Sequence, residues 1–195
     1  IEAARNHRLP DPRDAAVREL QQRFRVDTTH ATRIQNRALQ LWTSMQGAQQ
    51  ADGEASRELD WACALHELGM MVSHHDHHRH SSYLLSHVDA AGFSQSQLRR
   101  LAALVLGQRG ELIKLAEHLH DKVLMSQVLC LRLAVILHHA RVDLPVPANA
   151  GPCLAGNAWK RLLATRLAAA APPYGGGQAS ITALNNALDD INKRL

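Results

Sequence analysis

Apolar residues recur every three or four positions through most of the chain, which is the spacing of one face of an α-helix. In the clearest case the apolar positions are Ala31, Ile34, Ala38, Leu41, Trp42 and Met45. A second stripe, in residues 58–71, consists of Leu59, Ala62, Cys63, His66 and Met70. Because His66 falls on this stripe, the spacing predicts that its imidazole faces the protein interior.

Residues typical of helix starts mark further helices. Asp11 before Pro12 is typical of an N-cap followed by proline at the first helical position, and Asp27 or Thr28 is expected to cap the next helix. The Ser94-to-Gln97 spacing is that of a capping box. Residues 121–141 are apolar on most sides and predict a central buried helix. Since no alternating strand pattern of useful length is found, we expect an all-α bundle of six to seven helices.

Glycine and proline divide the chain. Residues 47–56 read as a polar linker, and the prolines and glycines between 145 and 152 form a larger break. We expect one helical domain over residues 1–143 and a helical appendage over 144–195, with a flexible glycine joint at 175–177. A seam in this appendage could hold a second copy of the chain in a homodimer. It consists of Ile181, Leu184, Leu188, Ile191 and Leu195.

Composition removes several classes of protein. Of the 195 residues, 46% are hydrophobic but only 4% aromatic, and the formal net charge is +4, which excludes disorder of the whole chain. The most apolar run, residues 123–140, contains polar side chains and reads as a buried helix rather than a membrane span. Three distant cysteines and the lack of an apolar leader favour a cytoplasmic protein. No specific nucleic-acid signal is present, because aromatic and basic residues are not interleaved.

Histidine is unusually frequent, with seven of the 13 histidines between residues 66 and 87 and five within residues 74–80. Imidazole binds metals and changes charge near neutral pH. We expect residues 74–80 to form a loop or short turn. Three interpretations stay open: a metal tract with His74 and His78 four residues apart, an anion-binding loop in which Arg79 donates, or a solvated turn.

Another pair of histidines could face one another across two helices. His30 lies on the edge of the stripe that begins at Ala31, and His66 precedes Glu67. A metal site needs ligands from several elements, and these three residues are candidates. The alternative is that both imidazoles are core groups hydrogen-bonded to carbonyl oxygens.

An ordered set of motifs resembles a known family over about residues 12–143. The motifs are Arg25-Val26-Asp27, His30-Ala31 with Arg33-Ile34, Trp61-Ala62 with Leu65-His66-Glu67-Leu68-Gly69, Ser73-His74, His78-Arg79-His80-Ser81 with Tyr83-Leu84-Leu85, Gly92-Phe93-Ser94, and Leu131-Arg132-Leu133-Ala134-Val135-Ile136-Leu137. Together they resemble the C-terminal helical domain of the bacterial exopolyphosphatase / guanosine pentaphosphate phosphohydrolase family. The resemblance implies an HD-like fold, related to that of metal-dependent phosphohydrolases.

The resemblance also implies a function. In that family two N-terminal domains of the actin-like ATPase type hold the Mg²⁺-dependent catalytic site, and we expect them to lie upstream of Ile1. The helical domain is then a binding and positioning module for inorganic polyphosphate or guanosine pentaphosphate, not catalytic by itself, and contributes to a homodimer. The phosphate contacts expected from the resemblance and from the basic residues are His74, His78, Arg79, His80 and Arg109, with Arg99 and Arg100 as a second basic patch.

Compared with HD hydrolases, the expected metal site has lost carboxylates. His30 and His66 match the two histidines, but Glu67 replaces an aspartate, and the position of a later aspartate falls in an apolar stretch around Val135. We therefore expect this site to be vestigial, since hard cations need carboxylate charge. The alternative is a freestanding HD-type phosphohydrolase acting on guanosine tetra- or pentaphosphate or a related phosphate ester, with His30, His66 and Glu67 as the metal ligands.

Overall fold

The computed structural model describes residues 11–46 and 53–138, and these residues form helices and connecting turns without a strand. The elements are α1 (Pro12–Arg23), α2 (Thr28–Gln46), α3 (Glu54–Leu65), the 3₁₀ segment η1 (Leu68–Met71), α4 (His77–His87), α5 (Gln95–Gly107), the 3₁₀ segment η2 (Leu112–His118) and α6 (Lys122–Leu137). The prediction of an all-α bundle is confirmed.

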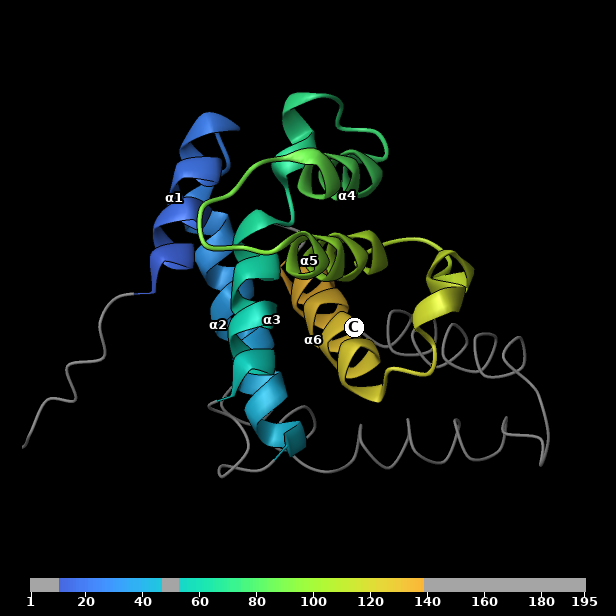
Figure 1. Ribbon diagram of the computed structural model, residues 1–195. Coiled ribbons are helices and arrows are strands. Elements are labelled where there is room, and N and C mark those ends of the chain that lie inside the picture. Colours follow the sequence, from blue (N-terminus) through green and yellow to red (C-terminus); the bar gives the residue numbers. More distant parts are fainter. Residues whose placement is uncertain (1–10, 47–52, 139–195) are drawn as a thin grey trace, which may run out of the picture.

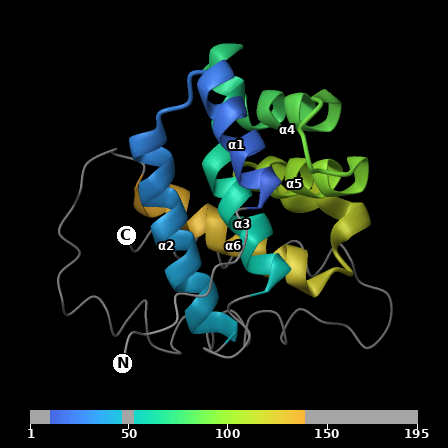
Figure 2. The same ribbon diagram turned by 60° about the vertical axis from the view of Figure 1, so that its left-hand side comes forward.

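The helix α3 lies at the centre of the bundle. It packs against α1, α2, α5 and α6, while α4 lies along α5 and against η1 (Figures 1 and 2). Because α3 is surrounded in this way, its residues from Trp61 to Leu65 are all buried. In α6 the buried stretch runs from Gln127 to Ala134, as expected for a central helix.

The predicted helix starts are confirmed by hydrogen bonds. The Asp11 carboxylate accepts from the backbone N–H of Arg13 (2.9 Å), and that of Asp27 accepts from the N–H of His30 (3.0 Å). Both halves of the Ser94–Gln97 capping box are formed. These caps satisfy N–H groups that have no partner within their own helix.

Two segments differ from the sequence-based expectation. The helix predicted over residues 58–71 begins earlier, at Glu54, and ends at Leu65; after a break, η1 follows. The prediction of a loop through residues 74–80 is wrong from His77 onward, where α4 begins. The physical reason is the left-handed backbone of Asp76 (φ 56°, ψ 25°), which turns the chain and lets the Asp76 carbonyl accept from the N–H groups of Arg79 and His80.

The appendage expected over residues 144–195, with its glycine joint and dimer seam, lies outside the described residues and stays a prediction. Within the described part of the chain, every helix is too short or too polar to cross a lipid bilayer.

Candidate functional site

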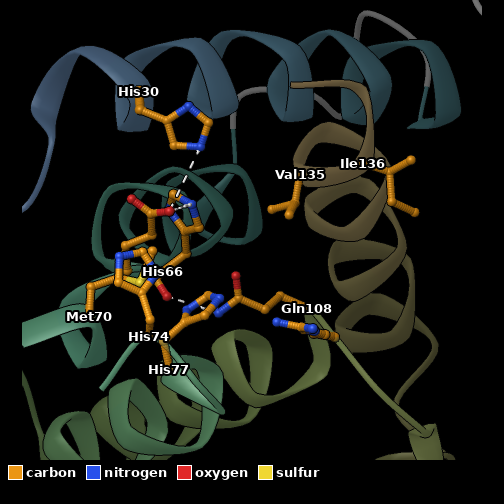
Figure 3. A pocket seen from close by; sticks show the side chains of 10 residues that line it. His30, His66, Met70, His74, His77, Gln108, Val135 and Ile136 are labelled. Atoms are coloured by element: carbon orange, nitrogen blue, oxygen red, sulfur yellow. Dashed lines mark hydrogen bonds and ion pairs between the residues drawn. The ribbon is translucent and has the colours of Figure 1, made fainter. Parts of the chain in front are cut away.

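Two helix ends bring His30, His66 and Glu67 together. His30 lies in the first turn of α2, His66 directly follows α3, and Glu67 precedes η1. The Nε2 atoms of His30 and His66 lie 3.9 Å and 4.0 Å from the same carboxylate oxygen of Glu67, and the two rings are 5.7 Å apart (Figure 3). All three residues are buried, with exposed fractions of 4%, 1% and 7%.

The end of α3 is what turns neighbouring side chains toward one point. Adjacent residues on a continuous helix point about 100° apart. At Glu67 the backbone leaves helical geometry (φ −104°, ψ 12°), so its carboxylate can face the same space as the His66 ring. The His66 carbonyl accepts hydrogen bonds from the Ser81 hydroxyl on α4 (3.0 Å) and from the side-chain amide of Gln108, which follows α5 (2.8 Å).

A pocket of about 590 Å³ opens beside these three side chains. Its polar lining continues through His74, His77, Gln108 and Arg109. Met70 and two residues of α6, Val135 and Ile136, supply apolar surface (Figure 3). The stretch in which the resemblance placed a lost aspartate therefore borders the pocket with aliphatic side chains.

Next to the pocket, basic side chains from three elements gather around Gly110. Lys114 of η2 donates to the carbonyl of Arg109, and Arg132 of α6 donates to the carbonyl of Gly110. His78 of α4 also approaches Gly110, since its Nε2 would lie 3.9 Å from a Cβ at that position. We call His78, Arg79, Arg109, Lys114 and Arg132 the cationic cluster.

The pKa values of two members are lowered by burial and, secondly, by this crowding of positive charge. Burial, followed by the charges of Arg132 and Arg79, lowers the pKa of Lys114 to about 8. Burial, followed by the charges of Lys114 and His77, lowers the pKa of His78 to about 4. Asp76 opposes both shifts without cancelling them. At neutral pH the positive charge of the cationic cluster is therefore carried by Lys114 and the three arginines, and His78 takes part as a neutral imidazole.

The other predicted phosphate contacts lie in different surroundings. His74 is exposed at the pocket, and His80 is half-buried against η1 next to Gly69. Arg99 is exposed on α5, but the guanidinium of Arg100 is bound to the carboxylates of Glu58 and Asp121. Thus His74 borders the pocket and His80 packs at η1 outside the pocket lining, while Arg100 joins α5 to α3 and α6.

Sequence reasoning missed Lys114, Arg132, His77 and Gln108 as site residues. Arg132 carried a signal, because a charged residue in a run of buried apolar positions usually has a specific role. Lys114 carried none, since it becomes part of the site only through the turn between α5 and η2.

Comparison with known proteins identifies the family. Residues 13–169 match the family described as Ppx/GppA phosphatase, domain III, and this match passes residue 143, so the domain boundary expected there stays a prediction. The chain is also similar to a guanosine-5'-triphosphate,3'-diphosphate pyrophosphatase of Photobacterium profundum, with 33% identity over 133 residues. That region is 67% of this chain but 27% of the relative. The chain therefore belongs to the Ppx/GppA phosphatase family, and it corresponds to the family's helical domain III.

Proposed function

We propose that this domain binds and positions a chain of phosphate groups for a phosphohydrolase whose Mg²⁺-dependent catalytic domains are separate from it. The observation that carries this proposal is the cationic cluster around Gly110. Its members come from α4, η2, α6 and the turn after α5, so the fold, not a local sequence run, concentrates the charge.

Electrostatics favours an anion at this place. Among the described residues, Arg79, Arg109 and Lys114 form no salt bridge with a carboxylate, and the charges of Arg79 and Arg132 weaken protonation of Lys114. Neighbouring positive charges repel one another more strongly where they are partly buried. A phosphate oxyanion would relieve that repulsion and accept charge-assisted hydrogen bonds.

The pocket gives the anion a direction in which to extend. Arg109 belongs both to the cationic cluster and to the pocket lining, and His77 connects the start of α4 to the same pocket. A ligand with several phosphate groups could occupy both places at once, whereas a single phosphate would occupy one. This favours a phosphate chain as the ligand, and the relative's name, which contains a triphosphate and a diphosphate, agrees with that chemistry.

Replacing Lys114 with glutamine is expected to weaken binding of inorganic polyphosphate about tenfold at low salt, or about 1.4 kcal/mol. The lost group is a partly buried ammonium facing the expected anion. Titration calorimetry on the 195-residue chain measures this, with guanosine pentaphosphate as a second ligand. The matched control is Lys122→Gln, a substitution of an exposed lysine at the start of α6 and ten residues before Arg132, which should retain the wild-type affinity.

Salt and pH supply independent readouts. The logarithm of the association constant should fall linearly with the logarithm of the salt concentration. The slope should be roughly −0.7 for each phosphate contact if the polymer behaves as a single-stranded polyanion. Between pH 7 and pH 9 binding should weaken, because the pKa of Lys114 is about 8 and its charge is lost over that range. In Lys114→Gln this part of the pH dependence should disappear. Equal losses in Lys114→Gln and Lys122→Gln would contradict the assignment to the cationic cluster.

A second candidate is a phosphohydrolase activity of this chain itself, favoured by the convergence of His30, His66 and Glu67. Phosphate release from guanosine pentaphosphate by the purified chain, lost in Glu67→Gln, would support it. Binding of the nucleotide without any release would leave the positioning role alone.

A further inference from the structure

We propose that His30, His66 and Glu67 form a binding site for a borderline transition-metal cation such as Zn²⁺, with one coordination position open to the pocket. This goes beyond binding of phosphate and does not depend on it. The cation proposed here also differs in its preferred ligands from the Mg²⁺ expected in the catalytic domains.

The three ligand atoms are close to a coordinating arrangement. One atom from each residue lies within 4.8 Å of the other two, and both imidazole Nε2 atoms are 3.9–4.0 Å from the Glu67 oxygen. Bonds of about 2.0–2.1 Å in a tetrahedral site put ligand atoms roughly 3.4 Å apart. Closing this difference requires a shift of about half an ångström by the Glu67 carboxylate and an approach of the two imidazole nitrogens by up to about 1.4 Å, which small rotations of the three side chains can supply.

The orientation of His66 is the second observation. Its Nδ1 lies 2.7 Å from the carbonyl oxygen of Cys63. A carbonyl only accepts, so Nδ1 carries the hydrogen and the lone pair of the neutral ring is on Nε2, which faces Glu67. Metal-binding histidines are commonly held this way, with the second ring nitrogen donating to a carbonyl or carboxylate.

Burial of Glu67 provides the third observation. Its side chain is only 9% exposed, so water screens the attraction between its carboxylate and a bound cation only weakly. A divalent cation between the carboxylate and the two imidazoles would therefore be held strongly at the centre of the group.

The donor set selects the kind of cation. Two imidazole nitrogens and one carboxylate suit Zn²⁺ and its neighbours, whereas Mg²⁺ and Ca²⁺ prefer oxygen ligands throughout. The expectation of a vestigial site concerned hard cations, for which too few carboxylates are present. With three protein ligands, the remaining position points to the pocket of about 590 Å³, where water or an anionic group can enter.

Calorimetric titration of the metal-free 195-residue chain with Zn²⁺ tests the proposal. We expect one tight site per chain, and a loss of affinity of about 100-fold or more in Glu67→Gln, since even residues that only support a ligand contribute roughly 10- to 100-fold. The visible spectrum of added Co²⁺ should show low-symmetry coordination in the wild type and lose it in the variant. His75→Ala and His87→Ala, at exposed histidines away from the pocket, should leave both readouts unchanged.

Binding by the histidine-rich surface is the competing explanation. The proposal is overturned if Glu67→Gln keeps the tight site, or if His75→Ala removes it. Circular dichroism in the presence of chelator shows whether a variant is folded, and His30→Gln serves in place of Glu67→Gln if the latter is not. Polyphosphate affinity measured in chelator reports on the cationic cluster separately, so failure of the metal site and failure of phosphate binding are distinguishable.

Discussion

Gly69→Ala is expected to lower the free energy of unfolding by more than about 3 kcal/mol, above the usual range for an overpacked site. A Cβ at this position would lie 2.2 Å from the backbone oxygen of His77 and 2.5 Å from the backbone nitrogen of Ser81. Both obstacles belong to the backbone of α4 and cannot rotate away. The substitution therefore forces η1 and α4 apart. Since Glu67 directly precedes η1, it also moves Glu67 away from the start of α4.

The close contact at Gly69 is reinforced by hydrogen bonds. The Gly69 N–H donates to the Ser81 hydroxyl (2.8 Å), which itself donates to the His66 carbonyl. Urea unfolding of Gly69→Ala measures the loss, and Gly53→Ala is the matched control, because a Cβ there meets nothing within 4 Å. The control should change stability by less than about 1 kcal/mol, the cost of alanine at an N-cap. Equal effects of the two substitutions would show that α4 does not depend on this close approach.

Arg100→Gln is expected to cost about 2 kcal/mol of stability, less than for a fully buried ion pair because the side chain of Arg100 is 27% exposed. Its Nε donates to Glu58 (2.8 Å) on α3 and its NH2 group to Gln127 (3.3 Å) on α6. It also pairs with Asp121, which caps α6 through the N–H of Leu124. Removing the guanidinium leaves the Glu58 carboxylate, 13% exposed, without its main cation.

Arg99→Gln provides the comparison, since Arg99 is exposed and adjacent. It should change stability by no more than about 0.5 kcal/mol, as for most surface substitutions. Thermal unfolding of the two variants measures the difference. Polyphosphate affinity of folded Arg100→Gln should stay near the wild-type value; a clear loss would instead support the second basic patch expected from the sequence.

The local pattern was sufficient to predict α1, α2, α5 and α6, and the caps of the first three. Apolar spacing of three and four and the residues Asp11, Asp27 and Ser94 each report on contacts within a few positions of the chain. The start of α4 could not be predicted this way, because it depends on a left-handed Asp76 and on the close packing of Gly69 from another element. Local composition indicated a polar turn, and tertiary packing produced a helix.

In the candidate site, too, some residues could be predicted from the local pattern and others depend on tertiary packing. The convergence of His30 and His66 followed from helical faces, and Glu67 from its position beside His66. The cationic cluster depends on residues 22 positions apart, Gly110 and Arg132, meeting through a hydrogen bond that no local pattern reports. Arg100 shows the opposite case. The sequence predicts it as a phosphate contact beside Arg99, but its guanidinium pairs with Glu58 of α3 and with Asp121, which caps α6.

The pKa of His78, followed by NMR of its imidazole, tests the phosphate-binding account most directly. Without ligand it should lie at about 4, because burial and the charges of Lys114 and His77 oppose protonation. Bound polyphosphate would place negative charge beside the ring and favour the protonated form, so the pKa should rise by at least about one unit. The imidazole signals of His87, exposed at the far end of α4, should hardly change on addition of polyphosphate at constant pH. Saturable polyphosphate binding that leaves the pKa of His78 at about 4 would contradict the account.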